Sequence, residues 1–118
     1  MNKNFKVDLL SEAINFLESL DDKPREKIYY NARKAQIVNH PELFKKLTNF
    51  IWEFRTKYNK NQYRLLAFWD KTEKETTLVL ATHGFVKKSQ KIPQSEIQRA
   101  EEIRKQYFEQ KMKDNEKR

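Results

Sequence analysis

Apolar and polar residues change their spacing along the chain, and the N-terminal third combines a strand pattern with a helix pattern. Residues 5–10 (FKVDLL) alternate between apolar and polar side chains, which predicts a short strand. Residues 11–20 and 21–37 instead repeat apolar residues every three or four positions, as in a helix that packs on a core. Pro24 stands in the first turn of the second segment, where a helix accepts proline. We therefore predict a strand followed by a two-helix hairpin.

The middle of the chain returns to the two-residue alternation of strands. Residues 50–58 (FIWEFRTKY), 63–70 (YRLLAFWD) and 76–85 (TTLVLATHGF) each place apolar or aromatic residues at alternate positions. The polar segments 59–61 (NKN) and 70–75 (DKTEKE) between them are typical of turns. This order predicts an antiparallel three-stranded meander. Its first strand is expected to point three aromatic residues into the core: Phe50, Trp52 and Phe54.

The remaining segments complete the predicted fold. The chain from about Pro93 carries an apolar stripe at helical spacing, whereas 111–118 (KMKDNEKR) has little to bury and is expected to fray as a basic tail. The segment 39–47 repeats the helix-start signal in miniature, with Asn39 or His40 before Pro41 as its cap. The predicted fold class is α+β in a single domain over residues 1–110. It consists of a short N-terminal strand, a two-helix hairpin, an antiparallel three-stranded meander and a C-terminal helix, with the helices on one face of the sheet.

The charge balance narrows the class of partner. The 118 residues include 25 Lys and Arg against 17 Asp and Glu, a formal net charge of +8, and the pI is about 9.6. Such a basic domain favours RNA, DNA or a ribosome over an acidic small molecule. Without cysteine there is no disulfide framework, thiolate nucleophile or usual zinc site. No apolar run approaches the roughly 20 residues of a membrane span, and a signal-peptide pattern is missing, so we expect a cytoplasmic protein without membrane contact.

The candidate chemistry lies in cations around the meander. The sequence lacks the motifs of metal hydrolysis, nucleotide hydrolysis and serine catalysis, so no metal and no small-molecule cofactor is expected. Arg55 and Arg64 lie on neighbouring predicted strands and alternate away from the aromatic positions, so both are expected to face outward. Lys87 and Lys88 follow the third strand, and His83 lies at its end.

Cations that converge on one sheet face would bind a phosphodiester and stabilise the added negative charge of its transition state. In RNA the ribose 2′-hydroxyl is an internal nucleophile beside the phosphorus, so cleavage needs no metal. A lysine crowded by other cations can act as the base, and His83 can act as acid or base. Each residue also has a structural interpretation: the lysines could be solvated surface, Arg55 could pair with Glu53 or Asp70, and His83 could be structural.

Gly84 is the only glycine, and Lys87, Lys88 and Lys91 follow it closely. We expect it to end the third strand and turn the chain, so that these lysines lie over the outward side of the meander. The alternative is that a glycine here relieves a bulge or permits close packing.

Three stretches resemble one family. They are "LFKKLTNFIWEFR", "YRLLAFWD" and "LVLATHGFVKKSQKIPQSEIQRAEEIRKQY", and "HGFVKKSQKIPQSEIQRA" is the most specific block. Over residues 5–108 the chain resembles the RelE/ParE superfamily, and most closely the HigB-like toxins of type II toxin-antitoxin systems. The resemblance implies a RelE-like fold and an mRNA endonuclease that acts in the ribosomal A site through 2′-hydroxyl attack. It also implies three partners: the ribosome, mRNA and a helix-turn-helix antitoxin.

The same resemblance assigns roles to individual residues. It implies that Arg64 stabilises the transition state, that Arg55 contacts phosphate, and that Lys87 and Lys88 contact phosphate or supply the base. On this basis Arg64→Ala is expected to abolish cleavage with little change in folding. Further contacts with RNA, the ribosomal RNA included, are expected from lysines: Lys45, Lys46, Lys57 and Lys91.

Two departures from the family pattern leave part of the chemistry open. Ile92 stands where the family usually has threonine before Pro93, so a capping hydroxyl is missing. The catalytic tyrosine or histidine that many relatives carry near the C-terminus has no clear counterpart. Two other functions also fit the sequence. One is a ParE-like toxin that poisons gyrase, and the other is a non-catalytic nucleic-acid-binding module.

Overall fold

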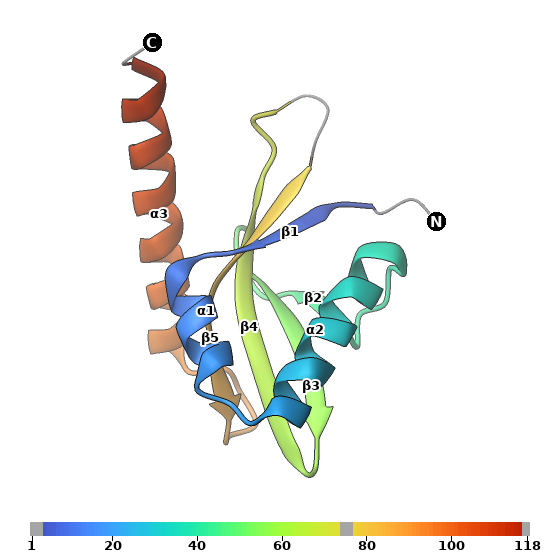
Figure 1. Cartoon of the computed structure of the whole chain (residues 1–118). Coiled ribbons are helices and arrows are strands. Elements are labelled where there is room, and N and C mark those ends of the chain that lie inside the picture. Colours follow the sequence, from blue (N-terminus) through green and yellow to red (C-terminus); the bar gives the residue numbers. More distant parts are fainter. Residues whose placement is uncertain (1–3, 74–76, 117–118) are drawn as a thin grey trace.

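The computed structural model describes residues 4–73 and 77–116 (Figure 1). It confirms the predicted layout of an N-terminal strand, two helices, an antiparallel meander and a C-terminal helix. The elements in chain order are β1 (Lys6–Leu9), α1 (Ser11–Glu18), α2 (Asp22–Ile37), β2 (Phe44–Lys46), β3 (Trp52–Tyr58), β4 (Asn61–Asp70), β5 (Leu78–Lys87) and α3 (Gln94–Glu116).

The described strands form one sheet in the order β1-β5-β4-β3-β2. β1 pairs with β5 in parallel, and the other neighbours are antiparallel. The β3–β4 hairpin turns at Asn59 and Lys60, which have φ values of 49° and 70°. Two consecutive residues with positive φ fit the tight turn whose twist matches the flanking strands. This turn fixes the register that places Arg55 directly opposite Arg64.

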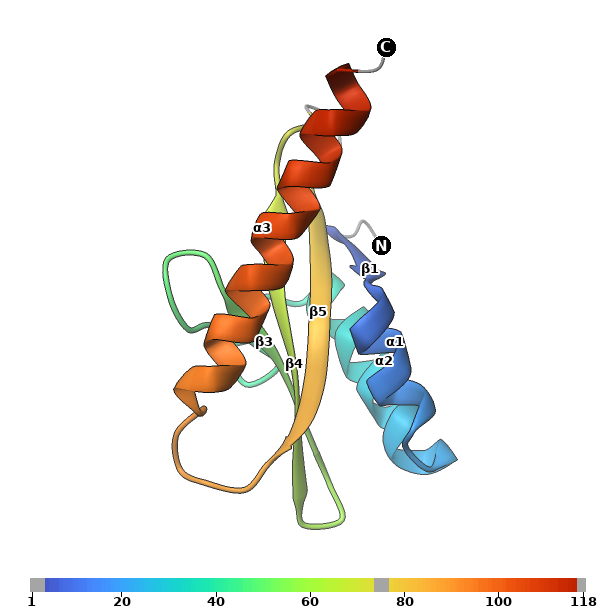
Figure 2. The same cartoon turned by 90° about the vertical axis from the view of Figure 1, so that its left-hand side faces the viewer.

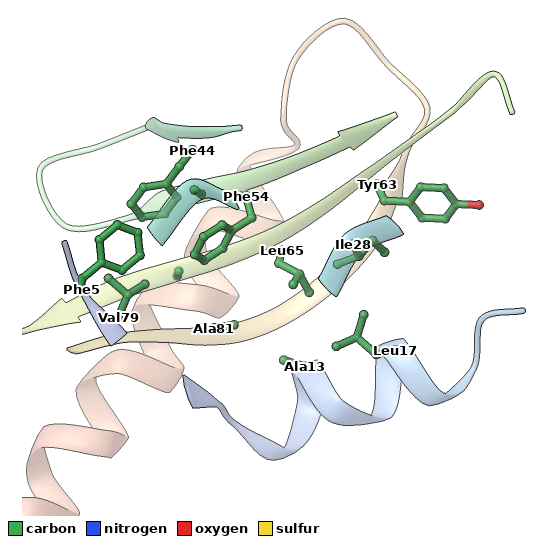
Figure 3. Packing of buried hydrophobic residues seen from close by; sticks show 12 residues of the cluster. Phe5, Ala13, Leu17, Ile28, Phe44, Phe54, Tyr63, Leu65, Val79 and Ala81 are labelled. Carbon is green, nitrogen blue, oxygen red and sulfur yellow. The ribbon is translucent and has the colours of Figure 1, made fainter. Parts of the chain in front are cut away.

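Helices cover both faces of the sheet, with α1 and α2 on one side and α3 on the other (Figure 2). The first core lies under α1 and α2 (Figure 3) and includes Leu17, Ile28, Phe54, Leu65 and Val79. The second core lies under α3 and contains Ile51, Leu66, Phe68, Leu80 and Ala100.

The prediction that all helices cover one face is wrong for α3. The central strand β4 is apolar on both sides, because Leu65 and Ala67 belong to the first core while Leu66 and Phe68 belong to the second. A strand that is apolar on both sides needs cover on both sides. The apolar stripe of α3 supplies this second cover.

The segment 39–47 forms a turn and the short strand β2, where the sequence predicted a helix start. Phe44 explains the difference, since its ring is buried and stacks on Phe54 with 4.3 Å between centroids. His40 serves as a cap within the turn, and its Nδ1 accepts the Glu42 N–H at 3.1 Å.

Phe50 also departs from its predicted place in the core. It precedes β3, in the β2–β3 loop of residues 47–51, and its side chain is 53% exposed. The Thr48 hydroxyl accepts the backbone N–H groups of Phe50 at 3.3 Å and of Ile51 at 3.0 Å. The loop therefore holds this ring outside the core.

Gly84 lies inside β5 and does not end it, so the turn predicted there is wrong. It pairs with Leu65 and has no positive φ. A Cβ atom at this position would overlap the ring of Phe16 and come within 2.8 Å of Leu65 Cδ2. The glycine thus permits α1 to pack closely on the sheet, which was the alternative interpretation.

A β-bulge in β5 decides which side chains of its second half face α3. Ala81 pairs with Ala67 and His83 with Leu66, so Thr82 has no counterpart on β4. The Thr82 hydroxyl donates to the Leu66 carbonyl at 3.1 Å. An extra residue reverses the alternation of the strand beyond it. As a result Lys87 lies on the α3 side, although Ala81 at the same parity belongs to the first core.

Asp70 anchors the second half of α3 to β4. Its side chain is 2% exposed, and Oδ2 accepts hydrogen bonds from the Tyr107 hydroxyl at 2.6 Å and Lys111 Nζ at 2.7 Å. Burial alone would raise the pKa of Asp70, but the hydrogen bonds from Lys111, Thr72 and Tyr107 outweigh it and hold the pKa well below its ordinary value. The described part of α3 runs to Glu116, well into the segment for which fraying was predicted.

We predict that Asp70→Asn lowers the free energy of unfolding at pH 7 by about 1.5–3 kcal/mol, the usual worth of hydrogen bonds to a charged group. A carboxylate with a depressed folded pKa stabilises the protein above its unfolded pKa and loses this contribution as the pH falls. Urea unfolding from pH 7 down to pH 2 should therefore show the two proteins converging below about pH 4. A constant difference across this range would contradict the assignment.

Candidate functional site

The strands bring cations from four neighbouring strands onto the side of the sheet that faces α3. Arg55 is opposite Arg64, Lys45 is opposite Glu53, and Gln62 is opposite Lys87. Alternation then places on this side one cation from each of β2, β3, β4 and β5, at an inter-strand spacing of about 4.8 Å. We call this group the cationic face; it consists of Lys45, Arg55, Arg64 and Lys87.

Arg64 is buried within this face, whereas the sequence predicted an outward-facing side chain. Its side chain is 3% exposed, and Nε lies 2.7 Å from Oε1 of Glu53, which is itself buried. Nη1 donates to the Tyr63 carbonyl at 3.0 Å, and Nη2 donates to Gln62 Oε1 at 2.8 Å. Burial lowers the pKa of Arg64 while Glu53 raises it. The guanidinium is therefore fixed in one orientation.

Arg55 borders a groove beside Arg64. The groove has a volume of about 330 Å³, and Lys57, Gln62 and Glu42 also line it. Arg55 Nε is buried and has no hydrogen-bond partner among residues 4–73 and 77–116. Its predicted alternative partners are engaged elsewhere, since Glu53 pairs with Arg64 and Asp70 with Lys111. The groove can therefore offer the guanidinium of Arg55 to a phosphate.

Lys87 is partly buried at the end of β5. Burial lowers its pKa first, and the positive charge of Arg64 lowers it next. Of the smaller influences, Glu53 raises the pKa, while Arg55 and Lys45 lower it. A lysine with a lowered pKa is neutral in a larger fraction of molecules near pH 7 and can accept a proton.

His83 lies apart from the cationic face, under the first turns of α3. Its Nε2 is 3.5 Å from Glu96 Oε1 and its Nδ1 is 3.1 Å from the Thr82 hydroxyl. Burial lowers the pKa of His83, and Glu96 opposes that shift. Phe85 stands between His83 and Lys87 on the same side of β5. The structure therefore places His83 with α3 and away from Arg55.

The other predicted RNA-binding lysines lie around the cationic face in different directions. Lys57 lines the groove of Arg55, whereas Lys46 is opposite Trp52 and so faces the other side of the sheet from Lys45. Lys91 follows β5 and is exposed, and so is Lys88, which was predicted as a catalytic residue. Lys57 thus borders the site, whereas Lys46, Lys88 and Lys91 lie outside it.

Glu53 and Gln62 are site residues that the sequence did not assign. Glu53 was weighed only as a partner of Arg55, although the same alternation puts it on the side of Arg64 as well. Its pairing with Arg64 depends on the hairpin register, which the sequence pattern alone does not fix. Among the described residues, no group of three or more His, Asp or Glu side chains is placed to hold a metal ion.

Comparison with known proteins places this fold and site in a family. Residues 15–105 match the family described as phage-derived protein Gp49-like (DUF891). The chain belongs to this family, which is part of the RelE/HigB-like toxin superfamily. The match spans the stretch from α1 into α3 and so includes every residue of the cationic face. No curated protein matches the chain. Within the described residues, no helix is long and apolar enough to span a membrane.

We predict that Arg64→Ala destabilises the protein by about 3–5 kcal/mol, because it leaves the buried Glu53 carboxylate unpaired. This replaces the expectation that the substitution spares folding. The matched control is the double variant Arg64→Gln with Glu53→Gln, which removes both charges and should recover part of the loss. Urea unfolding measures all three proteins. If Arg64→Ala were as stable as the wild type, the Glu53–Arg64 pair would not contribute to stability.

Proposed function

We propose that the protein is a HigB-like toxin that cleaves mRNA on the ribosome by attack of the ribose 2′-hydroxyl. The observation that supports this most is the cationic face, in which the immobilised Arg64 on β4 lies between a partly buried Lys87 on β5 and Arg55 and Lys45 on β3 and β2. Such a group fits a phosphodiester and the negative charge that develops on it. Family membership supports a toxin of this superfamily.

In the proposed reaction, Arg55 and Lys45 bind the non-bridging oxygens of the scissile phosphate. Neutral Lys87 removes the proton of the 2′-hydroxyl, and the resulting oxygen attacks the adjacent phosphorus. The bond from phosphorus to the 5′-oxygen breaks as the 2′,3′-cyclic phosphate forms. The 5′-oxygen leaves as a hydroxyl after taking a proton from water or from the protonated Lys87.

Arg64 has a supporting role in this proposal. Two of its N–H donors hydrogen bond to the Tyr63 carbonyl and Gln62, and its Nε lies 2.7 Å from the Glu53 carboxylate, so its charge is held in place before the substrate arrives. A fixed charge in a site of low dielectric stabilises the transition state without reorganisation. Burial lowers the pKa of Lys87 most, and the positive charge of Arg64 lowers it further. Arg64 would thus stabilise the charge on the phosphate by its electrostatic field and also lower the pKa of the proposed base, Lys87.

The exposed lysines around the site fit a ribosomal location. Lys46, Lys57, Lys88 and Lys91 would contact ribosomal RNA, and the net charge of +8 would strengthen the encounter. A helix-turn-helix antitoxin is the proposed protein partner, since family membership suggests a toxin-antitoxin pair. A toxin that acts in this way would work in the cytoplasm, where ribosomes and mRNA are found.

We predict that Arg55→Ala reduces cleavage about 10²- to 10³-fold, the usual loss when one donor to the transition state is removed. The assay is a purified translation mixture with one message, with and without ribosomes. Lys34→Ala, an exposed lysine on α2, is the matched control and should cleave like the wild type.

Each alternative outcome of this assay contradicts the proposal in a different way. Intact message in the presence of ribosomes excludes the nuclease. Inhibition of DNA supercoiling by gyrase, without RNA cleavage, would instead favour the ParE-like function. Salt-dependent RNA binding with no cleavage and no effect on gyrase would indicate the non-catalytic binding module.

We predict a pH dependence that identifies the base. The wild-type kcat/KM should rise with pH until Lys87 is largely neutral and then become constant. Lys87→Arg keeps the positive charge but stays protonated, so its rate should fall about 10²- to 10⁴-fold and lose the rise with pH. Single-turnover cleavage across a pH series measures the pH profiles of the wild type and of Lys87→Arg. An unchanged pH profile in the variant would assign the base to another group.

A further inference from the structure

A second group of cations and aromatic rings lies toward the opposite end of the sheet from the β3–β4 hairpin. It forms a groove of about 510 Å³ where the β2–β3 loop, the end of β4 and α3 come together. We call it the aromatic groove, and the residues used below are Lys46, Phe50, Trp52, Trp69, Lys71 and Arg104.

The charges that line the aromatic groove are all positive. Lys46 comes from β2, Lys71 follows β4, and Arg104 projects from α3. Among the described residues, no carboxylate lines the groove. Three cations from separate parts of the chain therefore surround one concave surface, which favours an anionic ligand.

Phe50 presents a flat apolar surface beside these cations. Its side chain is 53% exposed, and the guanidinium carbon of Arg104 lies 4.1 Å from the ring centroid. The hydrogen bonds of Thr48 to the loop backbone hold the segment that carries the ring. An exposed phenylalanine on an ordered loop, next to an arginine, is typical of surfaces on which nucleobases stack.

The floor of the groove contains both tryptophans of the chain, Trp52 and Trp69. Their rings meet edge to face with 5.6 Å between centroids, and Lys71 Nζ lies 5.2 Å from the ring centroid of Trp69. The indole Nε1 of Trp69 is buried and has no hydrogen-bond partner within the described residues.

We propose that the aromatic groove binds an unpaired base of single-stranded RNA together with its neighbouring phosphate. The base would stack on Phe50, and the phosphate would lie among Lys46, Lys71 and Arg104. An acidic peptide would satisfy the cations, but it would leave the exposed ring of Phe50 without a flat partner. Because the groove combines cations with an exposed aromatic ring, it favours a nucleic acid over an acidic peptide.

This inference rests on the proposed nuclease function and extends it to a neighbouring part of the substrate. Lys45 belongs to the cationic face and the next residue, Lys46, lines the groove. Arg64 and Trp69 are five positions apart on β4, about 17 Å at the rise of an extended strand. Trp69 packs on the first core, on the face of the sheet opposite Arg64. An RNA strand that binds both sites would therefore pass around the β2 edge of the sheet, with the stacked base several nucleotides away from the cleaved bond.

The test measures binding of a short single-stranded RNA whose riboses carry 2′-O-methyl groups, so that no cleavage can occur. Anisotropy of a fluorescein label on the RNA reports affinity, and intrinsic tryptophan fluorescence reports occupancy of the groove. We expect binding to change the tryptophan fluorescence, and Phe50→Ala to weaken affinity about tenfold, as the loss of one stacked base would. Phe50→Tyr should retain wild-type affinity because it keeps the aromatic face.

Tyr30→Ala is the matched control, since Tyr30 on α2 is also 53% exposed but lies outside the groove. It should bind RNA like the wild type. Binding of Phe50→Ala equal to that of the wild type would overturn the inference. So would RNA binding without any change in tryptophan fluorescence, or an equal change produced by a poly-glutamate peptide.

Failure of the groove and failure of the nuclease give different results. If Phe50→Ala binds normally while Arg55→Ala still loses cleavage in the translation mixture, the groove is wrong and the nuclease stands. If RNA changes the tryptophan fluorescence and Phe50→Ala weakens RNA binding, but no message is cleaved with ribosomes present, the groove proposal stands and the nuclease proposal is wrong.

Discussion

The buried ion pair between Glu53 and Arg64 is the interaction on which the cationic face depends. Four cations on neighbouring strands repel one another, and the Glu53 carboxylate beneath them offsets part of that repulsion. Both side chains are almost fully buried, so the loss of either partner would leave the other charge buried and without an ion-pair partner. The pair therefore holds Arg64 in place, and the positive charge of Arg64 adds to burial in lowering the pKa of Lys87.

The architecture explains why the site lies near the hairpin end of the sheet. β4 is apolar on both faces along its second half, where α3 covers Leu66 and Phe68. Closer to the β3–β4 turn the same side of the sheet becomes polar, and the groove beside Arg55 lies there. The anchor at Asp70 holds α3 at the opposite end of β4. The α3 side of β4 is therefore covered by the helix along its second half and carries the polar site nearer the β3–β4 turn.

The sequence pattern predicted the strands and helices well, and it placed Arg55 and Arg64 on one side, because a period of two needs only local information. It failed where contacts between residues distant in the sequence decide which face of the sheet a helix or side chain occupies. The apolar stripe of α3 does not show which face of the sheet the helix covers. The need for glycine at position 84 comes from its contact with Phe16, which is distant in the sequence. The bulge at Thr82 moves Lys87 to the α3 side, a reversal that alternation cannot reveal. The burial of Arg64 likewise depends on Glu53 from another strand.

The most direct measurement is the pKa of the Lys87 amine in the folded protein, followed by nitrogen-15 NMR in the wild type and in Glu53→Gln. We predict a wild-type pKa below the ordinary value of a lysine amine. In the variant it should fall further, because Glu53 is the nearby charge that raises it. An ordinary lysine pKa that is the same in both proteins would contradict a cationic face organised around this ion pair.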